Sequence, residues 1–106
     1  MLVAFSVAPS GGTSPDASVH DAVAAAVEVV RASGLPNSTD SMFTTIEGEW
    51  DEVFDVVKRA TLAVQAYGPR VSLVLKADIR PGRSGELTGK VERLEAALDE
   101  RSQAQP

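Results

Sequence analysis

Hydrophobic residues recur along the chain with two periods, and each period predicts a different kind of element. Spacings of three and four residues place side chains on one face of a helix. They predict one helix from Ser18 to a stop at Gly34, and another from Trp50 to a stop at Gly68-Pro69. The apolar faces comprise Val19, Ala22, Val23, Ala26, Val27 and Val30 in the first helix, and Trp50, Val53, Val57, Ala60 and Val64 in the second. Both helices are therefore amphipathic and need a partner surface.

Alternation of large apolar with small or polar residues predicts the strands. It is longest in Leu2–Ala8 and Arg70–Ile79 and shorter in Phe43–Glu47, while the polar segment Asn37–Ser41 is a short edge strand at best. The order strand, helix, strand, strand, helix, strand is that of the split β-α-β motif. We therefore predict an α+β, ferredoxin-like βαββαβ fold, with a four-stranded antiparallel sheet and two helices on one of its faces.

An additional helix is expected after these elements, from about Thr88. Its apolar stripe is narrow and consists of Val91, Leu94 and Leu98. Residues 99–106 are expected to form a frayed tail. The chain has 106 residues and lacks a repeat or linker, so residues 1–106 are predicted to form a single domain.

The alternation also assigns the two faces of the sheet. The face toward the helices should carry Val3, Phe5, Val7, Ile46, Leu73 and Leu75, and the open face Ala4, Ser6, Thr45, Glu47, Ser72, Val74 and Lys76. With the first strand between the third and the fourth, as is usual in this fold, Ser6 would lie between Thr45 and Ser72. Such a row of small hydroxyl groups favours either a second sheet or a ligand on the open face.

Composition and charge narrow the possible functions. The chain has no cysteine and one histidine, His20, which excludes disulfides, thiolate chemistry and a multi-histidine site within one chain. A net charge of −5 argues against nucleic acid or an anionic membrane as the main partner. The apolar start, Met1–Val7, has no basic residue and soon breaks at Pro9–Gly12, which is not the pattern of a signal peptide. We expect a cytoplasmic protein.

Several stretches of the sequence resemble the small thiamine-binding protein family. They are L-V-A-F-S-V-A-P, S-V-H-D-A-V, S-G-L-P, M-F-T-T-I-E-G-E-W-D-E-V-F-D-V-V-K-R-A and R-V-S-L-V-L-K-A-D-I-R. The resemblance covers about residues 1–98. It implies a ferredoxin-like fold, back-to-back pairing of sheets, a homotetramer, and binding of thiamine or its hydroxymethylpyrimidine part without catalysis. Asp40 stands where many members of the family carry threonine, and Phe43 where many carry glycine.

The ligand implied by the resemblance needs a particular set of polar groups. An aminopyrimidine has a donor group and two ring acceptors, which a carboxylate and hydroxyl groups can match. We hypothesise that it lies on the sheet-pairing surface with Glu47 opposite a ring nitrogen. The candidate ligand-binding residues are Ser6, Asp40, Thr44, Thr45, Glu47, Ser72 and Lys76. In the alternative interpretation the hydroxyl residues are merely small enough for sheets to pack, Glu47 accepts hydrogen bonds from backbone N–H groups, and Lys76 pairs with a neighbouring acid.

Three classes of function are compatible with this fold. The first is a small-molecule binding protein. The alternative is a purely structural or regulatory homo-oligomer whose open sheet face is filled by its mate. The third is an enzyme with Glu47 as general base, for which the sequence offers no nucleophile–base pair or cofactor loop. The acids between Glu47 and Asp55 are typical of a helix start rather than of a metal site, so we expect neither catalysis, nor a cofactor, nor a metal.

Overall fold

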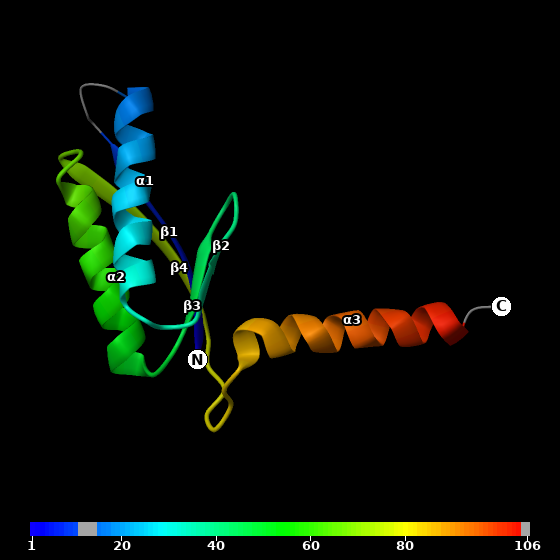
Figure 1. Cartoon of the computed structure of the whole chain (residues 1–106). Helices are drawn as coiled ribbons and strands as arrows, with labels where there is room; N and C mark the ends of the chain where they lie inside the picture. Colours follow the sequence, from blue (N-terminus) through cyan, green and yellow to red (C-terminus); the bar gives the residue numbers. More distant parts are fainter. Residues whose placement is uncertain (11–14, 105–106) are drawn as a thin grey trace.

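The computed structural model describes residues 1–10 and 15–104 and contains one sheet and three helices in this part of the chain. The elements are β1 (Leu2–Ser10), α1 (Pro15–Ala32), β2 (Asn37–Thr39), β3 (Thr44–Glu47), α2 (Trp50–Gln65), β4 (Arg70–Asp78) and α3 (Glu86–Ala104). The sheet is antiparallel with the order β2-β3-β1-β4, and α1 and α2 lie side by side over one of its faces (Figure 1). This arrangement confirms the predicted ferredoxin-like α+β fold.

The core lies between the sheet and the pair α1 and α2. Val3, Phe5 and Ile46 are exposed by 2% or less, as the alternation predicted for the helix-facing side. Leu75 is partly buried against this core, but Leu73 is 42% exposed because it lies on β4, the outer strand, near the margin that α2 covers. Burial of aliphatic and aromatic side chains of this kind is the main stabilising contribution to such a fold.

The register of the strands corrects one sequence-based expectation. Ser6 does not lie between Thr45 and Ser72; Ala4 lies between Thr45 and Lys76, and Ser6 is opposite Val74 on β4. The cause is the point at which β3 meets β1. β3 pairs only with the first part of β1. The backbone N–H of Gly48 donates to the carbonyl of Met1 at 3.1 Å, which fixes the end of β3 beside the start of β1.

Two helix assignments also differ from the sequence-based prediction. α1 begins at Pro15 rather than Ser18, in keeping with the preference for proline in a first helical turn. β1 continues to Ser10, past the expected break at Pro9, and residues 11–14 lie outside the described ranges. Trp50 is not on the buried face of α2: it is 53% exposed, and Val56 is among the buried residues of that helix instead.

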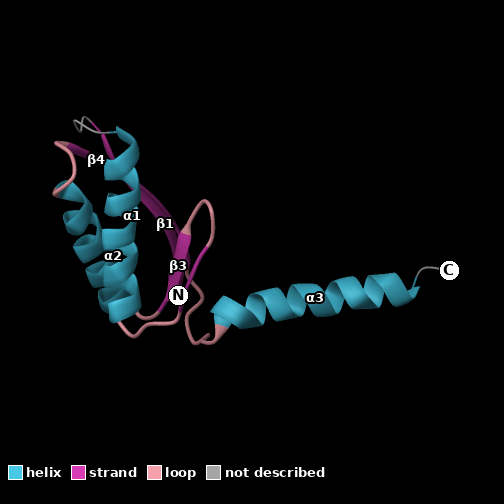
Figure 2. Cartoon of the chain, turned by 45° about the horizontal axis from the view of Figure 1, so that its top comes forward, coloured by secondary structure: helices cyan, strands magenta, loops and turns pink. Residues whose placement is uncertain are grey.

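α3 projects from the rest of the molecule on the side of the sheet away from α1 and α2 (Figures 1 and 2). Only its first residues are buried or half-buried, and Val91, Leu94 and Leu98 are all about half exposed. The helix continues to Ala104, and residues 90–104 contain neither glycine nor proline. The frayed tail at residues 99–106 stays a prediction. Within the described ranges, none of the helices is long and apolar enough to span a bilayer.

Candidate functional site

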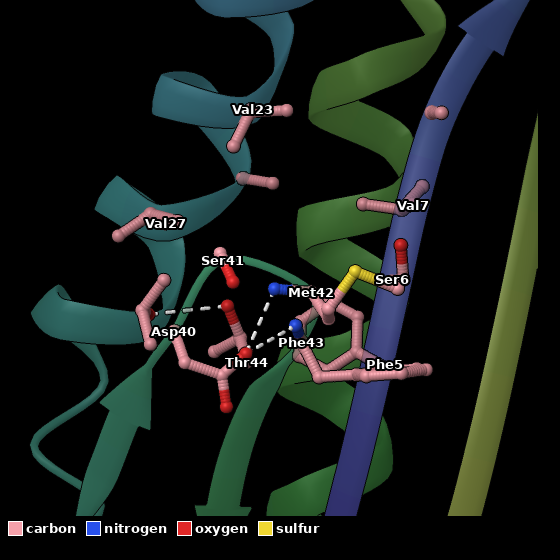
Figure 3. A pocket seen from close by; sticks show the side chains of 13 residues that line it. Phe5, Ser6, Val7, Val23, Val27, Asp40, Ser41, Met42, Phe43 and Thr44 are labelled. Carbon is pink, nitrogen blue, oxygen red and sulfur yellow. Dashed lines mark hydrogen bonds between the residues drawn. The ribbon is translucent and has the colours of Figure 1, made fainter.

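A cavity of about 190 Å³ lies between α1 and the hairpin that joins β2 to β3 (Figure 3). We call it the hairpin cavity. Its apolar wall is formed by Val23, Ala26 and Val27 of α1 and by Phe5 and Val7 of β1; its polar rim carries Ser6, Thr39, Asp40, Ser41 and Thr44. The combination of an apolar wall and a few convergent polar groups is typical of small-molecule sites.

The cavity exists because β3 is much shorter than β1. Pairing of β1 with β3 ends at Phe5 and Thr44, whereas pairing with β4 continues from Leu2 to Ser10. Beyond Phe5, the other edge of β1 has no strand beside it among the described residues. Alternate residues of a strand direct both their N–H and C=O groups to the same edge. Backbone donors and acceptors of the β1 segment that lines the cavity therefore face a space that a ligand can enter.

Asp40 shapes the turn of the hairpin. Its Oδ1 accepts hydrogen bonds from the backbone N–H groups of Met42 and Phe43 at 2.8 and 2.9 Å (Figure 3). These two bonds hold the pKa of Asp40 below its ordinary value, so the side chain is a carboxylate at neutral pH. In the described part of the chain no hydrogen bond reaches its Oδ2, which leaves this oxygen for a ligand.

Three of the seven candidate residues meet at the hairpin cavity: Ser6, Asp40 and Thr44. Thr44 is buried, and its hydroxyl lies 3.1 Å from that of Thr39 on the neighbouring strand. This contact ties the two strands together next to the turn. The hairpin is thereby held in the conformation that closes one side of the cavity.

Glu47 lies elsewhere. Its buried carboxylate accepts hydrogen bonds from the backbone N–H groups of Glu86 and Leu87 at 2.8 and 3.2 Å. Backbone N–H groups thus satisfy the carboxylate, as the alternative interpretation had it. However, they belong to the first turn of α3 and not to α2. Both oxygens of Glu47 are engaged without a ligand.

The remaining candidates lie on the open face. Thr45 and Lys76 flank Ala4, and Ser72 is exposed on β4 opposite Ala8. None of the three lines the hairpin cavity. The structure therefore divides the candidate set between two places, and the hypothesis of a ligand on the sheet face stays a prediction.

Sequence reasoning missed the contribution of α1 to the cavity. Val23 and Val27 were assigned to the buried face of their helix, yet Val23 is 41% exposed and lines the cavity with Val27. No signal for this was present in the sequence, since six apolar residues over the roughly three turns from Val19 to Val30 are the ordinary density of one buried face. Met42 at the tip of the hairpin, 71% exposed, was likewise not singled out.

The acids at the start of α2 have a structural role. The Glu52 carboxylate accepts a hydrogen bond from the backbone N–H of Glu49 at 3.1 Å, as in a capping box. Among the described residues, no group of three acidic or histidine side chains is arranged to hold a metal ion. The capping box shows that Glu52 stabilises the start of α2, and the expectation of no metal stays a prediction.

The fold and the cavity together define a small ferredoxin-like α+β protein with a cavity beside its hairpin. The family described as thiamine-binding protein matches residues 3–95, and the chain belongs to this family. It is 52% identical over 99 residues to the UPF0045 protein Mb1933 of Mycobacterium bovis, which covers 92% of this chain and 94% of the relative.

Solved structures show the same relationship. A domain of unknown function, DUF77, from Bacillus cereus is 36% identical, has a TM-score of 0.70, and covers 81% of this chain and 83% of its own. The Thermotoga maritima protein TM0486, provisionally named a thiamine biosynthesis/salvage protein, is 26% identical with a TM-score of 0.68 over 82% of this chain and 91% of its own. The resemblance seen in the sequence is thus confirmed, together with a general thiamine-related role.

Proposed function

We propose that the protein binds thiamine or its hydroxymethylpyrimidine part, with the pyrimidine ring in the hairpin cavity. The observation that carries this proposal is the meeting of three features in one place. An apolar wall from α1 suits the faces of an aromatic ring, the free edge of β1 suits its ring nitrogens and amino group, and the Asp40 carboxylate suits a donor or a positive charge. Membership of the thiamine-binding family supports the same ligand class.

The size of the cavity limits what can enter it. Its volume of about 190 Å³ is below the roughly 300–1,000 Å³ typical of pockets for drug-sized ligands. A single ring therefore fits better than two. We infer that the thiazolium ring of thiamine extends toward the mouth, where the carboxylate of Asp40 and the net charge of −5 favour a cation.

We further propose binding without catalysis, and with neither a cofactor nor a metal. The carboxylate nearest to the proposed ligand is Asp40, and its lowered pKa makes it a weak base at neutral pH. Glu47, the other candidate base, is already held by two backbone N–H groups. The site is better suited to holding a ligand than to moving a proton, and we place this binding function in the cytoplasm.

The open sheet face and α3 support a homo-oligomer, which we propose to be a tetramer formed by sheet pairing. Val74 is 56% exposed on this face, and Ser6, which lies opposite it on β1, is uncharged. Packing two such faces together removes them from water. The same surfaces favour the alternative function, a structural or regulatory oligomer without a ligand. In either case we propose neither nucleic acid nor membrane as a partner.

Calorimetric titration with thiamine, its phosphates and hydroxymethylpyrimidine tests the binding proposal. Val23→Phe should fill the cavity and abolish binding. Val19→Phe is the matched control, because Val19 is also 41% exposed on α1 but does not line the cavity.

Asp40→Asn keeps an oxygen to accept the two hydrogen bonds of the turn but removes the charge, and should weaken binding about tenfold or more. Glu47→Gln distinguishes a ligand on the sheet face from one in the hairpin cavity. A ligand on the sheet face should lose affinity in Glu47→Gln and bind normally to Val23→Phe. Absence of binding to the wild-type protein would refute the binding function and leave the alternative, a structural or regulatory oligomer without a ligand.

A further inference from the structure

A second cavity, of about 220 Å³, lies between the start of α2 and the loop that connects β4 to α3. We call it the arginine cavity. Its side chains include Trp50, Ile79, Arg80 and Arg83, and it shares no lining residue with the hairpin cavity. The two arginines come from a loop that contains proline and glycine, and this loop does not line the proposed thiamine site.

The charge at this cavity is opposite to that of the whole chain. Arg80 forms no ion pair with the described residues. Arg83 has only a long contact of 3.7 Å to Glu86, whose other carboxylate oxygen is held by Arg93 at 2.6 Å. Glu49 also lines the cavity, so one carboxylate stands against the two guanidinium groups. Two guanidinium groups are thus available to an anion, on a protein with a net charge of −5.

Trp50 supplies an aromatic surface beside these arginines. Its ring stacks on Phe54, with a centroid distance of 5.4 Å and an interplanar angle of 14°. The stacking fixes the orientation of the indole, yet the residue is still 53% exposed. Ile79, 47% exposed, adds an apolar side chain to the same cavity. An exposed tryptophan that is held in place in this way is suited to stacking with a planar ligand.

We propose that the arginine cavity binds a small planar aromatic molecule that carries a phosphate monoester. The ring stacks on Trp50 beside Ile79, and the phosphate receives hydrogen bonds from the guanidinium groups of Arg80 and Arg83. The planar fork of donors on arginine matches the geometry of phosphate oxygens. This site is separate from the proposed thiamine site and does not depend on it.

Trp50 is the single tryptophan of the chain, so intrinsic fluorescence reports on this cavity directly. Uridine 5′-monophosphate is the probe, and uridine and inorganic phosphate are its two halves. We expect saturable quenching by the nucleotide, with each half binding at least about tenfold more weakly. Arg80→Gln should weaken binding of the nucleotide about tenfold and leave that of uridine unchanged. Arg59→Gln is the control, since Arg59 pairs with Asp55 on α2 and does not line the cavity.

Three results would overturn the proposal. Uridine or phosphate alone could bind as tightly as the nucleotide, which would show that the two parts of the site do not act together. Arg80→Gln, with an unchanged circular dichroism spectrum, could bind the nucleotide normally. Val23→Phe could abolish nucleotide binding, which would assign the ligand to the hairpin cavity. If instead Val23→Phe abolishes the binding of thiamine but not that of the nucleotide, the two sites are independent. Either proposal can then fail without the other.

Discussion

The carboxylate of Glu47 at the end of β3 accepts a hydrogen bond from the backbone N–H of Glu86, 39 residues later in the chain, at 2.8 Å. Glu86 is the first residue of α3, where backbone N–H groups have no partner within the helix. The carboxylate also faces the positive end of the helix dipole. Together with the ion pair between Lys90 of α3 and Asp78 of β4, this contact attaches the helix to the sheet.

Glu47→Gln should loosen this attachment. The glutamine retains one carbonyl oxygen but presents an NH₂ group to the second backbone N–H, so one charge-assisted hydrogen bond is lost. We expect a loss of about 1.5–3 kcal/mol in the free energy of unfolding. Urea denaturation and amide hydrogen exchange at Leu87 measure the effect. Glu100→Gln, an exposed acid on α3, is the control and should change neither. Unchanged exchange at Leu87 in Glu47→Gln would contradict the anchoring role.

The start of α3 should also depend on pH through Glu86. The hydrogen bond from Arg93 holds the pKa of Glu86 below its ordinary value, despite the opposing effect of burial. A carboxyl group with a lowered pKa in the folded state stabilises that state above its unfolded pKa, and this stabilisation is lost as the pH falls through the folded pKa. The stability should therefore fall in acid, at and below about pH 4.5. Denaturation at a series of pH values measures this loss of stability, which should be smaller in Glu86→Gln. An equal loss in that variant would contradict the assignment.

Phe5 tests the assignment of the helix-facing side. It is 2% exposed at the centre of the core, so Phe5→Ala should leave a cavity and cost about 3–5 kcal/mol. His20→Ala, at an exposed position of α1, should cost less than about 0.5 kcal/mol. Both values follow from denaturant unfolding. Equal stability of the two variants would mean that the buried face of β1 is assigned incorrectly.

The fold could be predicted from the sequence because its signals are local and agree with one another. A buried face is specified by the alternation in β1 and β4 and by the helical spacing in α1 and α2. The apolar face of the sheet and the apolar faces of the two helices pack against each other. The register could not be predicted in the same way. Whether Ala4 or Ser6 lies beside Thr45 depends on a shift of two residues, which leaves every side chain on the same face.

The site was only partly predictable for a related reason. Asp40 and Thr44 were among the candidates, and they do line a cavity with Ser6. Glu47 has the chemistry of a ligand-binding residue, but its partner is a backbone 39 residues away, which no local pattern of the sequence reveals. The exposure of Trp50 was missed because its spacing fits the buried stripe of α2, although it is the first residue of that helix.

The final prediction concerns α3 and the proposed oligomer. A helix that projects into water gains little from packing, and an apolar stripe of Val91, Leu94 and Leu98 is costly there. A second copy of the chain would cover both this stripe and the open sheet face. We expect the wild-type protein to be larger than a monomer in light scattering at micromolar concentration. Leu94→Glu should weaken association at least about tenfold, because it places a charge within the covered stripe. Ala96→Glu is the matched control: it adds the same charge to the opposite face of the helix and should leave the assembly intact. A monomeric wild type would refute the oligomer, and equal dissociation of the two variants would exclude the stripe of α3 from the interface.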